Sequence, residues 1–550
     1  MRSKSLFLYF SWATAVVAAN ICPIIGPVFP APRNLHSVAA FQDTLKDIQA
    51  KIDEAFIAGN TTHGPVNPND TYSIQIFSTA SEDLLVDYHR RGSDILGNRT
   101  IDGDSIYRIA STSKLITIYL LLLQSGEEIF SHKVTKYVPE LLGVSFWDDI
   151  TVGSLAGFLG GIVAELLDLS SVQDISALLP GAVPPLAANE TLQCKFAGGC
   201  TREVFLQELV KSRVAYQPNT TPGYTNVAFS VLGLVVEAVS NSTFHEVLDD
   251  LLFTPLNLSK TTISAPEDLT NAVIPGNATT SGWDLSLNET HLAAMGGLFT
   301  TPNELSKIGR SILSSSLLPG STTRVWMKPS SFTSSLIGAV GPGFEIYRAV
   351  LNAKHNRVVD LYTKGGNLPG YGANLIMIPD FNVGIVLMQA GRRSTVGTSI
   401  LGMVLDDLLP ALEEEARIQA DDAFAGSYTA KNGLNSTVRL TSTPGIPGLS
   451  LVEWVSNGTN MRSDYLGDPE WVQMYPTNIL SKDGKQFSWR SSDFTLPDTG
   501  SPLDACPSWG AINRPTWGVY GLDEFVFHLD EDGKAWGLEP TALKIVLEKA

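Results

Sequence analysis

The sequence has few cysteines, and none of them forms a recognisable metal or redox pattern. Four cysteines occur in 550 residues, no two are spaced as CxxC, and HEVLD at His245 lacks the second histidine of an HExxH zinc site. A thioredoxin-like redox centre and a zinc site are therefore not expected. We predict no metal and no other cofactor.

Basic residues are also scarce. The chain has 38 Lys and Arg against 56 Asp and Glu, a formal net charge of -18. Proteins that bind phosphate backbones cluster Lys and Arg, so nucleic acid is not an expected partner. Because no long acidic block appears, we interpret the charge as a solvated acidic surface.

Long hydrophobic runs are missing beyond the N-terminus. No uncharged apolar run of about 18 residues occurs there, so a membrane anchor is not expected. The N-terminus itself reads MRSKSLFLYFSWATAVVAAN, with two cations, an apolar stretch and then small residues. This order is typical of a secretory signal peptide over residues 1–19, the alternative being a buried N-terminal helix. We predict a secreted, extracellular protein, and a monomer.

Two further features of the chain are consistent with secretion. Eleven Asn-x-Ser/Thr triplets are candidate glycosylation sites: Asn60, Asn69, Asn98, Asn189, Asn219, Asn241, Asn257, Asn277, Asn288, Asn435 and Asn457. The even number of cysteines suits an oxidising compartment. Cys194 and Cys200 bracket a short loop that can close on itself, which leaves Cys22 to pair with Cys506.

The pattern of apolar residues divides the mature chain into two domains, 20–420 and 421–550. Helical spacing, or a long apolar run, predicts helices over 38–57, 115–123, 201–213, 228–241, 243–253 and 399–420. Short β-rich segments predict strands over 72–78, 84–90, 361–366, 373–379 and 383–390. Strands at both ends with helices between them predict one sheet built from both ends of the first domain, with a helical insert beside it. Residues 421–550 read as turn-punctuated strands.

The segment Ser111-Thr112-Ser113-Lys114 is the first candidate for chemistry. On a helix the first serine and the lysine lie on one face, and a helix start favours a developing alkoxide. Burial or a second cation disfavours the ammonium form of lysine, and the resulting amine can accept the proton of a serine hydroxyl. The alternative is that SxxK occurs by chance and that the hydroxyls cap the helix.

A second candidate is PGYTN, which opens an apolar helix. Two nearby lysines would favour the phenolate of Tyr224, which could then exchange protons with a nucleophile or leaving group. Asn226 offers an acceptor for a lysine ammonium and a donor for a substrate carbonyl. The alternative is a tyrosine that packs in a turn and caps the helix.

A third candidate is Lys364-Gly365-Gly366-Asn367, which ends a predicted strand. Consecutive glycines weaken a strand, and close approach of a ligand is one reason to keep them. Lys364 would supply the second cation, and the N–H groups of Asn367 and Ser111 could form an oxyanion hole. The alternative is a hairpin turn with a surface lysine.

Together these segments resemble the three signature motifs of the serine β-lactamase and penicillin-binding-protein superfamily, closest to its class C and esterase branch. The segments are RIASTSK, PGYTN and YTKGGNLPGYGANLIMIPDFNVGIVLMQ. AAMGGLFTTPNELSKIGRSIL is similar to a segment between the second and third motifs. The resemblance covers about Thr71 to Ala390, and the remainder resembles fungal secreted β-lactamase-like proteins.

The resemblance implies an α/β (α+β) fold: an antiparallel sheet flanked by helices with a helical subdomain, followed by a C-terminal all-β domain. It also implies that Ser111 is acylated, that Lys114 activates it and that Tyr224 carries a proton. Asn226, Lys364, Gly365, Gly366 and Asn367 would bind the substrate. Which of lysine and tyrosine takes the first proton stays open.

Two departures from the family pattern bear on the substrate. Gly365 stands where many members carry a hydroxyl, which removes a contact to a substrate carboxylate and weakens the case for penicillin. The segment Phe158–Ile162 reads FLGGI where relatives often have a His-x-Ser-Gly-like loop, so the cleft wall is expected to be altered or more apolar.

The leading hypothesis is a secreted serine hydrolase that forms an acyl-enzyme from an ester, amide or lactam of a small molecule or peptide. An acyltransferase that uses the same acyl-enzyme is a close alternative. A catalytically silent member that binds a ligand or glycan is a third. A Ser-His-Asp hydrolase is disfavoured because the chain has no GxSxG motif.

Overall fold

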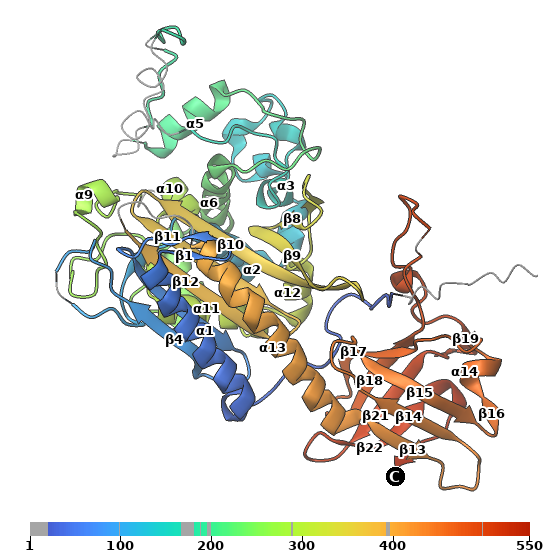
Figure 1. Ribbon diagram of the computed structural model, residues 1–550. Helices are drawn as coiled ribbons and strands as arrows, with labels where there is room; N and C mark the ends of the chain where they lie inside the picture. The colour runs from blue at the N-terminus through green and yellow to red at the C-terminus, as the bar shows by residue number, and fades with distance from the viewer. Residues whose placement is uncertain are drawn as a thin grey trace, which may run out of the picture. The chain divides into compact units, whose positions relative to one another are not determined.

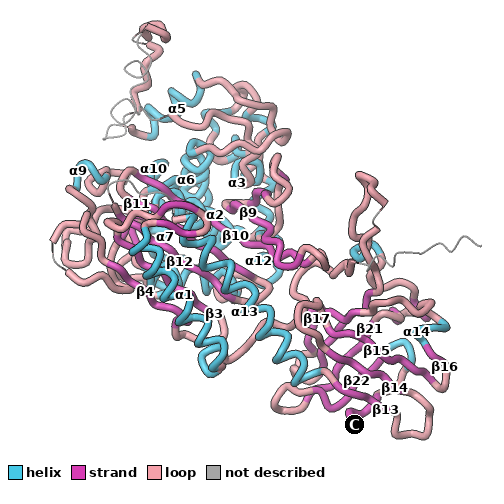
Figure 2. Tube along the Cα trace, in the orientation of Figure 1, coloured by secondary structure: helices cyan, strands magenta, loops and turns pink. Residues whose placement is uncertain are grey.

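The protein divides into two compact units. The computed structural model describes residues 20–97, 99–166, 181–187, 189–194, 200–287, 290–391, 397–497 and 499–550. The predicted signal peptide and the candidate glycosylation sites Asn98 and Asn288 lie outside these residues. The larger unit comprises Ala31–Ala349 and Val359–Ala416, and the smaller comprises residues 20–30, Val350–Val358 and Arg417–Ala550. Helices dominate the first and strands the second (Figure 2).

An eight-stranded sheet forms the centre of the larger unit. Its order is β4-β3-β12-β11-β10-β9-β8-β7. The strands are β3 Thr71–Ser78, β4 Leu84–Arg90, β7 Ser331–Phe332, β8 Gly338–Gly341, β9 Phe344–Asn352, β10 Arg357–Leu368, β11 Tyr371–Ile378 and β12 Val383–Ala390. β3 pairs antiparallel with both β4 and β12. The prediction of one sheet built from both ends of the domain is confirmed.

Helices cover both faces of this sheet. As a result, every residue of β3, β11 and β12 is buried, although successive side chains point to opposite faces. Figure 1 shows α1 (Ala39–Ala58) and α13 (Thr398–Phe424) over one face, and α11 (Pro302–Ser314) against the other. A helical subdomain adds α2 Ser113–Ser125, α3 Val152–Ala156, α5 Arg202–Lys211, α6 Asn226–Ser240, α7 Phe244–Leu248, α8 Thr254–Leu256, α9 Ala278–Ser281, α10 Thr290–Gly296 and α12 Gly320–Trp326. α2, α6 and α10 pack against one another.

The helices α11 and α12, which precede the strands predicted over 361–390, were not predicted. Thr301 caps α11 by accepting a hydrogen bond from the N–H of Glu304, and Pro302 occupies the first helical position. Both are ordinary helix-start signals. The helix expected over 243–253 is also divided, since α7 ends at Leu248 and a π-helical turn, Asp249–Phe253, follows.

The smaller unit contains a closed antiparallel barrel. The strand order β14-β13-β23-β22-β21-β18-β17-β15 returns to its start because β14 also pairs with β15, and β16 extends beyond β15. These strands are β13 Gly426–Thr429, β14 Thr437–Thr441, β15 Leu449–Ser456, β16 Thr459–Asn460, β17 Gln473–Leu480, β18 Gln486–Ser492, β21 Glu524–Leu529, β22 Ala535–Pro540 and β23 Leu547–Lys549. Eight strands leave an interior that side chains can fill. Buried aromatic rings fill it, with Phe525 packed on Trp454 and Phe527 on Trp489.

Cys22 and Cys506 form a disulfide within the smaller unit, as predicted. It ties the start of the described chain to the loop that follows β18.

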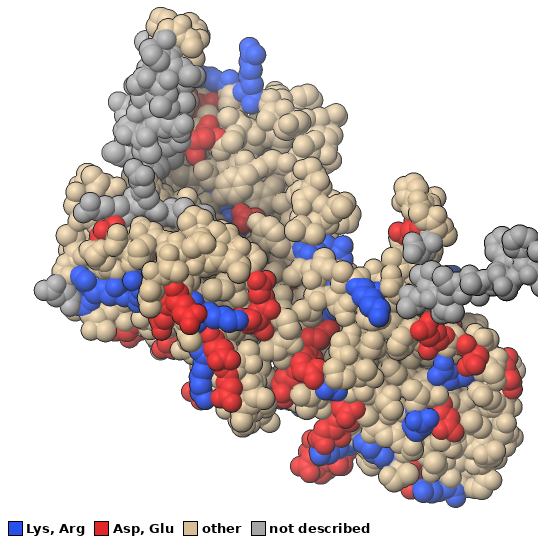
Figure 3. Space-filling view, viewed as in Figure 1, with Lys and Arg blue, Asp and Glu red and all other residues tan. Residues whose placement is uncertain are grey.

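The described residues contain neither a single membrane-spanning helix nor a cluster of metal-binding side chains. No single helix in these residues is long and apolar enough to cross a bilayer; α6 and the helical segment after it have the length and composition only when taken together, and they are bent by 79°. No group of three or more His, Cys, Asp and Glu side chains in the same residues has the geometry to hold a metal ion. On the face drawn in Figure 3, acidic side chains are interspersed with basic ones.

Candidate active site

Ser111 lies in a tight turn between β5 (Tyr107–Arg108) and α2. The turn is a 3-10 helix, Ala110–Thr112, and Ala110 has a φ of 47°. This left-handed conformation is uncommon for a residue with a Cβ and is concentrated at functional sites. Ser111 is half-buried, whereas Thr112, Ser113 and Lys114 are buried. The turn therefore leaves Ser111 as the member of the motif that a substrate can reach.

Lys114 lies at the centre of a hydrogen-bond cluster. Its Nζ is 2.9 Å from Ser111 Oγ and 2.7 Å from Asn226 Oδ1, and it also donates to the carbonyl of Met295 on α10. As an ammonium, Lys114 donates to all three oxygens. As a neutral amine it has two N–H groups, which Asn226 and Met295 can accept, and its lone pair then remains for the Ser111 hydroxyl.

The surroundings of Lys114 favour the neutral amine. Burial lowers the pKa of Lys114 well below the usual lysine range, and the Lys364 cation lowers it further. Glu165 and Glu345 oppose this and raise the same pKa. Burial is the largest of these effects, so the net shift of the Lys114 pKa is downward. Lys114 can therefore be a neutral amine, able to accept a proton, at a pH where an exposed lysine is already protonated.

Asn226 begins α6 and is oriented from both sides of its amide. Its Oδ1 accepts from Lys114, and its Nδ2 donates to Glu165 Oε2 at 2.7 Å. Thr225 caps the same helix through a hydrogen bond from the N–H of Ala228. The expectation that Asn226 accepts from the lysine matches this geometry. The structure adds that the amide also donates to a carboxylate.

Tyr224 lies between the two lysines. The Nζ atoms of Lys114 and Lys364 are each 5.3 Å from the centre of its ring, and its side chain is hydrogen-bonded to Ser111. The expected preference for the phenolate is wrong. Desolvation raises the pKa of Tyr224, and Glu345 and Glu165 raise it further, against the lowering effect of the Ser111 hydrogen bond. Tyr224 is therefore a proton donor at neutral pH.

The FLGGI segment forms an apolar wall beside Tyr224. The ring of Phe158 stacks on that of Tyr224, with centroids 5.6 Å apart and planes 18° apart, and it also packs on Phe229. Phe158 has a φ of 61°. An aromatic ring thus supports Tyr224 where relatives often have a polar loop.

Lys364 is buried within β10 and forms an ion pair. Its Nζ lies 2.7 Å from Glu345 Oε1 on β9 and also donates to the carbonyl of Gly365. The other oxygen of Glu345 accepts from the N–H of Gly365 at 3.2 Å. Burial lowers the pKa of Lys364, and Glu345 opposes this shift. The third motif is part of a strand and not a hairpin turn.

Gly366 allows β10 to lie against the turn that carries Ser111. A Cβ at this position would be 2.1 Å from the carbonyl oxygen of Ile109, and 2.9 Å from the backbone nitrogens of both Ser111 and Thr112. The reason for this glycine is therefore close approach of the protein's own backbone. Asn367, next in the strand, pairs with Gly372 of β11.

The structure thus brings together Ser111, Lys114, Tyr224, Asn226 and Lys364, with Gly365, Gly366 and Asn367 along the same strand. Sequence reasoning missed Glu165 and Glu345. No motif marks either residue: Glu165 follows the FLGGI segment, and Glu345 lies in a strand with a mixed burial pattern. Only their contacts reveal them.

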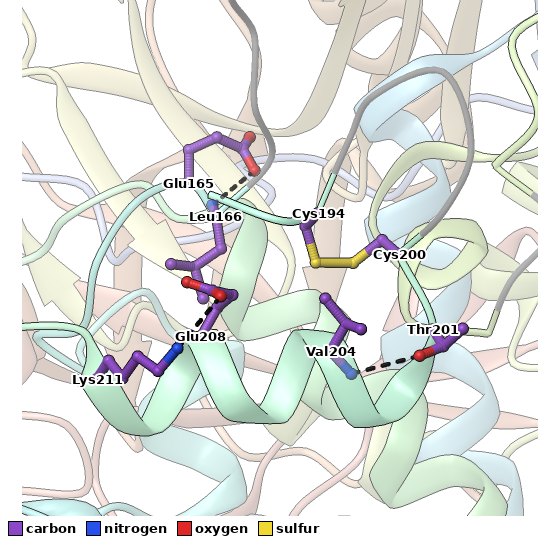
Figure 4. The surroundings of a disulfide bond; sticks show 8 residues. All are labelled: Glu165, Leu166, Cys194, Cys200, Thr201, Val204, Glu208 and Lys211. Atoms are coloured by element: carbon purple, nitrogen blue, oxygen red, sulfur yellow. Dashed lines mark hydrogen bonds and ion pairs between the residues drawn. A yellow bond between two sulfur atoms is a disulfide. The ribbon is translucent and has the colours of Figure 1, made fainter. Parts of the chain in front are cut away.

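A second disulfide, Cys194–Cys200, forms as predicted. Both cysteines are buried in the same hydrophobic cluster as Leu166 and as Phe205 of α5, and Figure 4 shows the bond beside the first turn of that helix. The bond therefore lies in the same packed region as the segment that carries Glu165.

Nine of the candidate glycosylation sites lie in the described residues, and all nine are exposed. Asn219 is one of them, and its Oδ1 accepts a hydrogen bond from Ser154 at the start of α3. Its backbone N–H donates to the carbonyl of Leu159, next to Phe158 in the wall beside Tyr224.

Comparison with known proteins identifies two family models in the chain. Residues 79–399 match the model described as Beta-lactamase. Residues 416–550 match the model described as Beta-lactamase-like-like, C-terminal domain.

Two relatives of fungal origin match over most of the chain. A Beta-lactamase-like protein of Arthroderma benhamiae is 29% identical, with 97% of each chain covered. Probable hydrolase M10 of a Phoma species is 26% identical over 83% of this chain and 78% of its own. Among solved structures, the octameric penicillin-binding protein homologue from Pyrococcus abyssi aligns with 92% of this chain and 98% of its own, at 14% identity and a TM-score of 0.49.

Proposed function

The chain belongs to the beta-lactamase family, and from that premise we propose that it is a serine hydrolase acting through an acyl-enzyme on an ester, amide or lactam. The observation that carries this proposal is the position of Lys114. Its buried amine, with a lowered pKa, lies 2.9 Å from the hydroxyl of Ser111. A nucleophile and a matched base in contact are what covalent catalysis requires.

In the proposed acylation step, Lys114 accepts the proton of Ser111 as Oγ attacks the substrate carbonyl. The N–H groups of Ser111 and Asn367 stabilise the oxyanion. Tyr224 donates its proton to the leaving group as the bond to the carbonyl carbon breaks. Tyr224 then recovers a proton from the Lys114 ammonium, which leaves an ester on Ser111.

In deacylation, water attacks the ester as the amine of Lys114 accepts its proton, and the Lys114 ammonium returns that proton to Ser111 as Oγ departs. Lys364 and Asn226 orient and polarise the substrate. Lys114 is the better candidate for the first base, because its pKa is lowered while that of Tyr224 is raised.

We propose in addition that the protein is secreted and glycosylated. The N-terminal sequence has the order of a signal peptide, nine exposed Asn-x-Ser/Thr sites are available and all four cysteines are paired. Each feature suits an oxidising, extracellular environment.

The test is to measure covalent labelling of Ser111. Purified protein is incubated with a panel of acyl donors and with a fluorophosphonate, and intact mass reports a single adduct. The adduct should disappear in Ser111→Ala, and labelling should be strongly slowed in Lys114→Met. Absence of any adduct across the panel from a folded protein would contradict the proposal.

A further inference from the structure

The charge that an incoming substrate meets at the third motif is negative. The side chain of Lys364 is 1% exposed, whereas that of its partner Glu345 is 31% exposed. The carboxylate is also held by two hydrogen bonds, one from Lys364 Nζ and one from the N–H of Gly365. The ammonium is therefore covered, and the carboxylate is the accessible member of the pair.

A second carboxylate belongs to the hydrogen-bonded group around Lys114. Glu165 accepts from Asn226, whose amide in turn contacts Lys114. The group therefore contains two carboxylates, those of Glu345 and Glu165, and the ammonium of Lys364 is buried. The site is therefore unsuited to an anionic substituent beside the scissile bond.

Position 365, directly after Lys364, offers no side-chain hydroxyl to compensate. Gly365 follows Lys364 directly and has no side chain, and its N–H already donates to Glu345. A substrate carboxylate at this point would have to displace Glu345 from both of its donors. That exchange gains no net hydrogen bond and leaves two carboxylates close together.

We propose that the cleft selects acyl substrates with no carboxylate next to the scissile carbonyl or its leaving atom, and that Glu345 enforces this selection. The inference rests on the proposed serine hydrolase function and narrows its substrates to neutral or cationic esters, thioesters and amides. Glu345 acts as a specificity residue and takes no part in bond making.

The experiment compares two thioesters that differ only in charge: the benzoylglycyl thioesters of thioglycolic acid and of thioglycolamide. Attack by Ser111 breaks the C–S bond and releases a thiol, which a chromogenic thiol reagent detects. Wild-type kcat/KM should be at least about tenfold higher for the carboxamide, the size expected for one unscreened like-charge contact at a partly exposed site.

Glu345→Gln should bring the two kcat/KM values to within about threefold, because Gln keeps the size of Glu but not its charge. Glu82→Gln is the matched control, since it removes one carboxylate that is 92% exposed and paired with Arg310; it should retain the wild-type ratio. In wild-type protein, raising the salt concentration should also narrow the ratio, which keeps the test valid if Glu345→Gln folds poorly.

Equal kcat/KM on the two thioesters in wild type, or a ratio that neither Glu345→Gln nor salt changes, would overturn the inference while leaving the hydrolase proposal intact. Failure of wild type to cleave either thioester, together with no adduct on Ser111, would refute the hydrolase proposal and this inference with it.

Discussion

Gly366→Ala should inactivate the site without removing any of the proposed catalytic side chains. The new Cβ would lie 2.1 Å from the carbonyl oxygen of Ile109, and ordinary contact begins at 3.4 Å, so strand and turn must separate by more than an ångström. The atoms affected are backbone atoms, and the same Cβ would be 2.9 Å from the nitrogen of Ser111. The nucleophile itself must therefore move relative to β10.

A misplacement of about 1 Å can cost roughly 100-fold in rate, and overpacking of this kind costs about 1–3 kcal/mol of stability. We therefore expect Gly366→Ala to slow acylation of Ser111 at least roughly 100-fold while remaining folded. The assay is the second-order rate constant of fluorophosphonate labelling, followed by intact mass, with thermal unfolding measured on the same samples.

The control is Gly510→Ala, because a Cβ at Gly510 meets no atom within 4 Å and its φ is not positive. This variant should label at the wild-type rate. The reasoning is refuted if Gly366→Ala labels Ser111 as fast as wild type, since the backbone contact would then not set the position of the nucleophile.

Three further outcomes are expected. Glu165→Gln removes a carboxylate that raises the pKa of Lys114, so the acid limb of the pH–kcat/KM profile should move to lower pH. An acid limb at the wild-type pH would contradict an electrostatic effect of Glu165 on Lys114. Burial raises the pKa of Asp70 from 3.8 to about 6, so the folded state binds this proton more tightly. The contribution of Asp70 to stability is at most about 3 kcal/mol; it is full below about pH 4 and is lost as the pH rises through about 6. In denaturant titrations between pH 4 and 7, the free energy of unfolding of Asp70→Asn should therefore depend less on pH than that of wild type. An equal pH dependence in both proteins would argue against this assignment. Asn219→Gln, which removes the glycan predicted at the cleft entrance, should change hydrolysis of bulky esters more than of small ones, and equal effects on both would count against that location.

Much of the fold could be predicted from local pattern. The helices α1, α2, α5 and α6 and the strands β3, β4, β10, β11 and β12 follow predicted segments closely, because periodicity and turn residues are local properties of the chain. The sequence did not predict α11 and α12, because the β-rich segments that follow them are the stronger local pattern, although Thr301 and Pro302 are helix-start residues.

The sequence by itself determined which residues are the candidates for the site, since the spacing within RIASTSK, PGYTN and KGGN is local and the motifs are specific in combination. It could not determine the electrostatics around them. Glu165 and Glu345 have no motif, and they reach Asn226 and Lys364 only through contacts between distant segments. The tertiary structure alone decided that Lys114 is buried enough to lose its proton readily, and that Tyr224 keeps its own, because desolvation depends on what surrounds a side chain and not on its neighbours in the chain.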